Sequence, residues 1–183
     1  HKLTFEDQYQ FKNSDLIFTI LKSGDLREDS GLYFSIGNFS ALFTVDANNL
    51  NFLKLPKVDL LASSFAGGAH GYPLNCENYE LKERIKMLQT DINFIKQTKF
   101  KYIKQIKPTY FLPYAGFFEE KLSRDEIYIK YNKKNKTDDY YNICKKYNVK
   151  LLDPEKKNIF QFDKNKNCKS SIYKGKYFKD LSS

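Results

Sequence analysis

Residues 61–74, Leu-Ala-Ser-Ser-Phe-Ala-Gly-Gly-Ala-His-Gly-Tyr-Pro-Leu, lie between an apolar strand pattern and the longest helix pattern of the chain. Three glycines and a proline within seven residues let the backbone adopt positive φ angles and approach a ligand closely. His70, one of two histidines in the chain, lies inside this segment. A tight connection without any function has the same composition, so the segment predicts either a site loop or a simple turn.

The composition predicts one domain over residues 1–183. The chain of 183 residues is 41% hydrophobic, which suits one core in a single domain or a piece of one, with residues 154–183 as a tail. Its 31 basic and 22 acidic residues give a net charge of +9, which favours an anionic partner. Because the lysines are scattered and no Arg-rich helix is present, nucleic acid is the less favoured anion.

The cysteines and the hydropathy predict a cytoplasmic protein that does not bind membranes. Cys76, Cys144 and Cys168 form no C-x-x-C pair, so neither a disulfide framework nor a thiolate zinc site is expected. No apolar run approaches the roughly 18 residues of a membrane span, and no leader pattern is seen. The opening at His1, on a polar segment, suggests a fragment of a longer protein.

Apolar runs of strand length fill the first third of the chain. The run at 16–21 has the β-branched, continuous pattern of a strand covered on both faces. Gly37-Asn38 is a two-residue turn that predicts a hairpin over 31–46. The remaining expected strands are a short edge strand within 1–14 and a buried strand at 58–63.

Asp46 follows directly on the second strand of this hairpin. A carboxylate at the end of a buried strand is held by a fixed backbone and suits a metal ligand or a general base. An N-cap or an Asx turn explains the same residue at the same place. Position alone leaves both interpretations open.

The apolar spacing from Leu81 onward predicts one long amphipathic helix over 78–106, which Pro108 ends. Its polar positions are interpreted as a solvated face without function. A short strand at 109–112 follows, and then a loop at 113–120 that is rich in Pro, Gly, aromatic residues and glutamate. If the helix is a crossover, the strands at 58–63 and 109–112 are parallel, and their loops leave the sheet at the same end.

Both loops are therefore expected to bind one anionic, nucleotide-containing ligand. Backbone amides near the glycines can meet phosphate oxygens close to the start of the helix, and the aromatic side chains offer flat faces to a base or sugar. Core packing explains the aromatic residues equally well. The candidate ligand-binding residues are Gly67, Gly68, His70, Gly71, Tyr72, Tyr114, Gly116 and Phe118, and the candidate metal ligands are Asp46 and His70.

The last third of the chain contains few residues that indicate a catalytic or binding function. Residues 121–136 are strongly polar and are interpreted as a solvated loop, with a basic lip for an anionic substrate as the alternative. Thr137 is expected to cap a helix over 138–147. Short strands are expected at 149–152 and 159–162.

Four segments, in this order and at these spacings, resemble the CMP-N-acetylneuraminate monooxygenase (CMP-sialic acid hydroxylase) family, in the later half of its metallo-β-lactamase-like domain. The resemblance is strongest between 44 and 131 and fades after 153. It implies an αββα sandwich of which this chain holds only the C-terminal part. The segments are Ser23-Gly24-Asp25 to Ser30-Gly31, Thr44-Val45-Asp46, Phe65 to Pro73, and Pro113 to Phe118.

The resemblance implies a metal-dependent oxygenase that acts on a nucleotide sugar, with iron or zinc as cofactor and a redox partner. Full-length members also carry a Rieske iron-sulfur cluster, whose C-x-H and C-x-x-H ligands this chain lacks. The H-x-H-x-D-H signature of the superfamily is absent too, and Pro113-Tyr114-Ala115 stands where other members have Pro-x-His. A metallo-β-lactamase-fold hydrolase and a non-catalytic, ligand-binding remnant of that fold are the alternatives.

Overall fold

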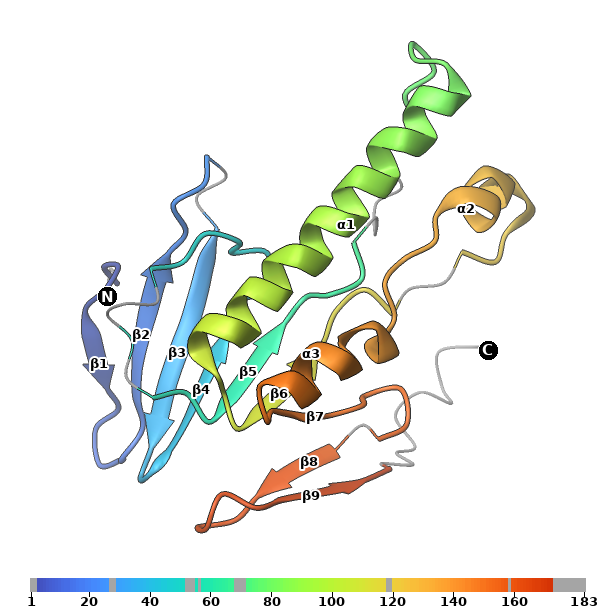
Figure 1. The fold of residues 1–183 in the computed structure, drawn as a ribbon. Helices are drawn as coiled ribbons and strands as arrows, with labels where there is room; N and C mark the ends of the chain where they lie inside the picture. The colour runs from blue at the N-terminus through green and yellow to red at the C-terminus, as the bar shows by residue number, and fades with distance from the viewer. Residues whose placement is uncertain are drawn as a thin grey trace, which may run out of the picture.

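A computed structural model describes residues 3–26, 29–51, 55, 57–67, 72–117, 120–157 and 159–172. Within these ranges, seven strands form one sheet in which the spatial order follows the chain order, β1 to β7 (Figure 1). Neighbouring strands are antiparallel from β1 to β4 and parallel from β4 to β7. The strands are β1 Gln8–Gln10, β2 Ile17–Lys22, β3 Ser30–Ile36, β4 Phe39–Phe43, β5 Leu60–Ser63, β6 Tyr110–Pro113 and β7 Lys150–Leu151. The predicted α/β class is confirmed.

The predicted hairpin is the β3–β4 pair, in which Ile36 lies opposite Phe39 across a turn whose Gly37 has a φ of 55°. The prediction for β2 is wrong in one respect. Of its six residues only Thr19 is buried, because β2 lies next to the edge strand and the helices pack over β3 to β6. A continuous apolar run therefore occurs here in a strand that is only partly covered.

Helix α1, Leu81–Ile106, matches the predicted long helix. Its N-cap is Glu80, whose backbone N–H donates to the Glu83 carboxylate at 3.3 Å, and its C-cap is Lys107, whose φ is 47°. The other helical segments are η2 Ser123–Asp125, α2 Glu126–Tyr131, η3 Thr137–Tyr140 and α3 Tyr141–Lys146. No helix in the described ranges is long and apolar enough to cross a membrane.

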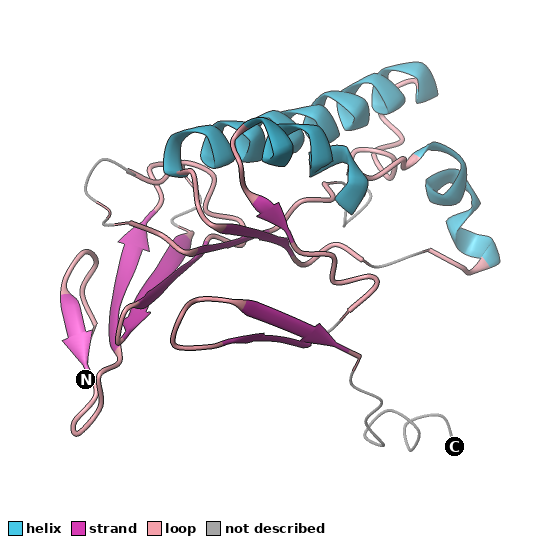
Figure 2. Ribbon diagram, turned by 60° about the horizontal axis from the view of Figure 1, so that its bottom comes forward, coloured by secondary structure: helices cyan, strands magenta, loops and turns pink. Residues whose placement is uncertain are grey.

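Helices α1 and α3 lie over one face of the sheet (Figure 2). The core on this face joins one buried side chain from each of β3, β4, β5 and β6 to residues of α1, η3 and α3. Tyr140 lies at its centre, with its ring near Phe65, Phe100 and Phe111 and its hydroxyl donating to the Phe65 carbonyl at 2.9 Å. Burial of such apolar area is the main force that holds α1 against the sheet.

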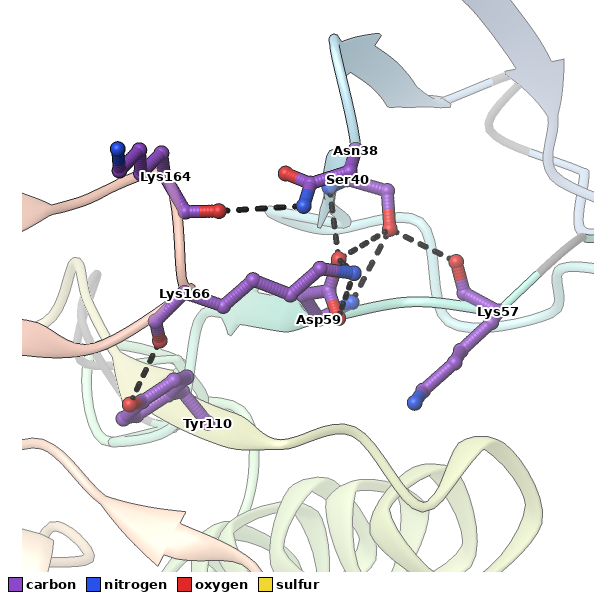
Figure 3. A network of polar contacts seen from close by, with 7 residues as sticks. All are labelled: Asn38, Ser40, Lys57, Asp59, Tyr110, Lys164 and Lys166. Atoms are coloured by element: carbon purple, nitrogen blue, oxygen red, sulfur yellow. Dashed lines mark hydrogen bonds and ion pairs between the residues drawn. The ribbon is translucent and has the colours of Figure 1, made fainter.

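Strands β8 Ile159–Phe162 and β9 Cys168–Ser171 form a hairpin on the opposite face (Figure 2). The Phe162 ring packs on Phe39 and Tyr110. In the turn between β8 and β9, the Lys166 ammonium group lies 2.9 and 2.8 Å from the two carboxylate oxygens of the buried Asp59 (Figure 3). The sequence pattern predicted β8 but not β9.

Asp59 is a buried carboxylate that sequence analysis also did not single out. It accepts hydrogen bonds from the backbone N–H and the hydroxyl of Ser40, at 3.0 and 3.2 Å, in addition to the Lys166 pair (Figure 3). Because Asp59 precedes β5, it lies at the opposite end of that strand from the glycine-rich segment. Its partners hold the hairpin to the sheet, so we assign it a structural role.

The interpretation of 121–136 as a solvated loop is wrong in two respects: the segment contains η2 and α2, and its end is buried. Asn135 is buried, and its amide group donates to the carbonyls of Phe65 and Ile92 at 3.1 and 2.9 Å. Thr137 is not the helix cap either, because it is buried and the preceding residue, Lys136, occupies the cap position. This segment therefore joins α1 to the β5 loop.

Candidate functional site

A cleft of about 920 Å³ lies between α1 and the carboxyl ends of β4, β5 and β6. The parallel register brings Ser63 opposite Pro113, and the backbone N–H of Tyr114 donates to the Ser63 carbonyl at 3.0 Å. The loops that follow β5 and β6 thus leave the sheet side by side, as the sequence predicted. Gly67 and Gly116, one from each loop, both line the cleft.

Gly116 lies against the loop after β5 and Gly67 lies against helix α1, so a side chain at either glycine would be crowded. A Cβ atom on Gly116 would lie 2.5 Å from the Ala66 Cβ, and one on Gly67 would lie 3.1 Å from the Ile92 Cα of helix α1. Their φ angles, +102° and +69°, are also ones that residues with side chains rarely adopt. Glycine is required here by both space and backbone conformation.

Among the residues that the structure describes, four with positive φ angles line this one cleft. Besides the two glycines, Val45 has a φ of 39° and Ala115 a φ of 62°. For a β-branched residue such as Val45 this conformation is a true outlier, with a cost of about 1–3 kcal/mol. Strained backbone that the surrounding structure holds in place is concentrated at functional sites in proteins, which supports the cleft as the site.

The turn that carries Asp46 is fixed from the β5 side. The Thr44 backbone N–H donates to the Ala62 carbonyl at 3.0 Å, and the hydroxyls of Thr44 and Ser63 lie 2.6 Å apart. The Ser64 hydroxyl donates to the carbonyl of Val45. The backbone beside Asp46 is therefore held by its neighbouring strand.

Helix α1 holds the same turn from the other side. The ammonium group of the buried Lys99 donates to Asn48 Oδ1 at 2.7 Å, and the Tyr102 hydroxyl donates to the Ala47 carbonyl at 3.0 Å. Burial raises the pKa of the Tyr102 hydroxyl, so it remains a neutral donor. Asn48 lines the cleft, so these contacts connect the helix interior to the site.

The wall formed by α1 comes from the middle of the helix. Lining residues run from Asp91 to Lys101, a span of about 15 Å at the rise of an α-helix. The expectation that a phosphate lies close to the start of the helix is wrong for this cleft, because α1 begins at Leu81, more than two turns before Asp91. The glycine-rich loop instead meets the helix at Ile92.

The described lining of the cleft is acidic. It contains the carboxylates of Asp25, Asp46 and Asp91 and the ammonium group of Lys101. Such a set suits hydroxyl or amino donors, whereas a phosphate group has a single ammonium group to meet, at the Lys101 end.

The predicted site residues divide into three groups. Asp46, Gly67, Tyr72 and Gly116 line the cleft, and Asp46 is exposed there. Tyr114 is not part of the described lining; its ring packs edge-on against Phe43 at 5.8 Å. Burial raises the pKa of the Tyr114 hydroxyl, and the negative charge of Asp46 raises it further. A hydrogen bond with the Val45 backbone lowers this pKa, but by less than burial raises it. The remaining candidates, Gly68, His70, Gly71 and Phe118, lie outside the described residues.

The metal prediction involves Asp46 and His70, of which only Asp46 is described. Within the described ranges, no group of three His, Cys, Asp or Glu side chains comes together that could hold a metal ion. The described residues alone therefore do not fit an iron or zinc ion, which needs about four ligands or more.

Sequence analysis missed the contribution of the α1 wall, because the polar positions of the helix were interpreted as a solvated face. Phe94 carried a usable signal. The core stripe of α1 includes Leu88, Ile92 and Ile103, and Phe94 falls outside this stripe while still being a large apolar residue. Such a position is a candidate for a contact outside the core, and the cleft identifies Phe94 as one.

No family model matches the chain. The cytidine monophosphate-N-acetylneuraminic acid hydroxylase of Pan troglodytes is 31% identical over 142 residues, which cover 75% of this chain and 24% of that protein. The protein of the same name from Asterias rubens is 30% identical over 148 residues, 78% of this chain and 23% of that protein. The inactive hydroxylase of Homo sapiens is 30% identical over 142 residues, 75% of this chain and 28% of that protein.

Among solved structures, a mutant of the CmlA beta-hydroxylase matches 81% of this chain and 31% of its own, at 14% identity and a TM-score of 0.47. A likeness of this size identifies neither fold nor function. The sequence matches are stronger, although the chain spans only about a quarter of the length of the relatives named above. Over three quarters of its own length, the chain is a relative of the cytidine monophosphate-N-acetylneuraminic acid hydroxylases, as its motifs predicted.

Proposed function

We propose that the chain is part of a hydroxylase that acts on a nucleotide-linked sugar, and that its cleft binds part of that ligand. The observation that carries the proposal is the position of the cleft at the carboxyl ends of the parallel strands β4, β5 and β6. Loops that a rigid sheet holds in place carry binding residues more often than other segments do, and here three such loops meet at one edge of the sheet. The names of the relatives supply the reaction class and the ligand.

The proposed architecture is one half of a metallo-β-lactamase-like αββα sandwich. Side chains alternate between the two faces of a strand, so Leu32 and Ile36 of β3 lie on the face opposite α1. The β8–β9 hairpin covers this face around Phe39 and Tyr110 and not over Leu32 and Ile36, which are 40% and 49% exposed. An apolar face of this kind suits packing against a second sheet.

The acidic lining suits the sugar portion of such a ligand. Sugar hydroxyls donate hydrogen bonds, and the carboxylates of Asp25 and Asp46 accept them. The anionic portion of the ligand is assigned to the end of the cleft at Lys101.

Asp46 is the proposed metal ligand, together with His70 and donors from elsewhere in the full-length protein. A bound iron or zinc ion would supply the redox or Lewis-acid chemistry, with electrons from a redox partner in the cytoplasm. The contribution of the described residues is structural. The hydrogen bonds at Thr44, Ala47 and Asn48 keep the Asp46 turn in one position.

The test is metal analysis and product analysis on the full-length protein. We expect Asp46→Ala to lower the content of iron or zinc and to abolish addition of an oxygen atom to a CMP-sugar, as followed by mass spectrometry. Asp138→Ala is the matched control, because Asp138 is an exposed carboxylate on η3 away from the cleft. Unchanged metal content in Asp46→Ala would show that Asp46 is not a ligand. Turnover by hydrolysis instead of hydroxylation would point to the hydrolase alternative.

A further inference from the structure

We propose that the cleft binds a cytosine-type base at the end of its α1 wall formed by Asp91 and Phe94. Phe94 stacks on the ring, and the Asp91 carboxylate accepts a hydrogen bond from the exocyclic amino group. This inference rests on the proposed function, and it names the part of the nucleotide that this end of the cleft recognises.

Phe94 is placed to bind a ligand. It lines the cleft and is 59% exposed to solvent, while the core residues of the same helix, such as Leu88 and Ile92, are buried. Tyr72, 46% exposed, lines the same cleft and offers a second aromatic surface. Exposed aromatic rings in a concave site are favourable surfaces for the flat face of a base.

Asp91 precedes Phe94 by three residues on α1, and both line the cleft. Side chains three residues apart are neighbours on a helix, with about 5–6 Å between their Cβ atoms. A ring stacked on Phe94 therefore presents its edge to the Asp91 carboxylate. The glycine-rich loop bounds this end of the cleft, because Gly67 approaches the helix at Ile92, between the two residues.

The carboxylate decides which base fits. An ionised carboxylate only accepts hydrogen bonds, so it pairs with the amino group at position 4 of cytosine. Uracil has a carbonyl oxygen at that position, which also only accepts, and the two groups repel each other. The ligand then extends along α1 toward Lys101, where its phosphate meets an ammonium group.

The experiment is calorimetric titration of the full-length protein and its variants with CMP and with UMP. The wild type is expected to bind CMP about tenfold more tightly than UMP. Phe94→Ala should weaken binding of both nucleotides about tenfold, and Phe94→Tyr should restore it. Asp91→Asn should bring the two affinities to within about threefold of each other, because an amide can donate to the uracil carbonyl as well as accept.

Two controls separate local from general effects. Tyr141→Ala removes an exposed aromatic ring of α3, and Asp138→Asn removes a surface carboxylate of η3; neither residue lines the cleft. Both should leave the two affinities unchanged. If the wild type binds CMP but Phe94→Ala binds it equally well, or Asp91→Asn keeps the full preference for CMP, the inference is overturned while the proposed function stands. If the wild type binds neither nucleotide at millimolar concentration, both the inference and the proposed function are overturned.

Discussion

The Lys99 ammonium group lies 2.7 Å from Oδ1 of Asn48, which joins the buried side of α1 to the turn beside Asp46. A fully buried lysine is uncommon in proteins, because an ammonium group loses its hydration in the interior. Lys99 also lies 5.2 Å above the centre of the Tyr102 ring, which interacts favourably with its charge. We interpret this contact as the means by which α1 fixes one wall of the cleft.

Lys99→Met is therefore expected to loosen the turn. The substitution keeps most of the length of the side chain but leaves the Asn48 oxygen without this donor, which should lower the free energy of unfolding by about 1–3 kcal/mol. Chemical denaturation measures this loss of stability. The rate of amide hydrogen exchange should increase most at residues 46–49. Lys104→Met, at an exposed position of α1, is the control. Equal stability of the two variants would show that the Lys99 contact contributes nothing.

Gly116→Ala tests the close approach of the two loops. The added methyl group would lie 2.5 Å from the Ala66 Cβ, and the backbone φ there is +102°. Because steric crowding and backbone strain both destabilise the folded state, we expect the free energy of unfolding to fall by about 3 kcal/mol. Gly37→Ala is the matched control, because its φ of +55° is also positive but nothing lies within 4 Å of the added atom. Its cost should be about 1 kcal/mol. Similar losses in both variants would contradict the contact with Ala66.

Val45→Gly should stabilise the protein. The φ of 39° is unfavourable for a β-branched residue, and the exposed side chain loses little packing on removal. Relief of strain should exceed the added flexibility of the unfolded chain and give a net gain of about 1 kcal/mol. Thermal unfolding measures this, with Val45→Ala as the variant that keeps a Cβ atom and most of the strain. A lower melting temperature for Val45→Gly than for Val45→Ala would show that the turn is unstrained.

Glu120 predicts a dependence of stability on pH. Burial alone would raise the pKa of this carboxyl, but the hydrogen bond and charge of Lys134 at 2.8 Å, with the amide of Asn132, hold the pKa below its ordinary value of 4.5. Because the folded state binds this proton less readily than the unfolded state, the stabilisation is complete above about pH 4.5 and is lost as the pH falls through the folded pKa.

The comparison that isolates this effect is between the wild type and Glu120→Gln, whose side chain has nearly the same shape and no charge. We expect the wild type to be the more stable at pH 7, and the difference in free energy of unfolding to shrink steadily below about pH 4.5. Denaturation series across this pH range would show it. A difference that stays constant down to pH 2 would mean that the pair with Lys134 does not form.

Local patterns predicted those parts of the fold that depend on neighbours in sequence. Gly37-Asn38 located the β3–β4 hairpin, and the spacing from Leu81 to Pro108 gave α1. The parallel pairing of β5 and β6 followed from the crossover between them, and with it the meeting of the two loops at Gly67 and Gly116. These inferences needed only turn chemistry, periodicity and the rules of chain connection.

The features that were missed depend on contacts between distant segments. Asn135 lies in a polar run, and only its hydrogen bonds to carbonyls 70 and 43 residues away place it in the interior. Lys166 pairs with Asp59 across 107 residues, and nothing near either residue indicates the pair. Phe94 and Asp91 belong to the site because the β5 loop packs against the middle of α1, a position that the sequence around each of them does not specify.

The central claim is that the loops after β5 and β6 form one binding site for a nucleotide-containing ligand. The most direct measurement is titration of the protein with CMP and CMP-sugars while the backbone amide resonances are followed. We predict shifts that saturate together at Gly67, Tyr72, Ala115 and Gly116 and along the cleft side of α1 between Asp91 and Lys101, with residues of the β8–β9 hairpin unchanged. No change at these amides at millimolar ligand would contradict the account.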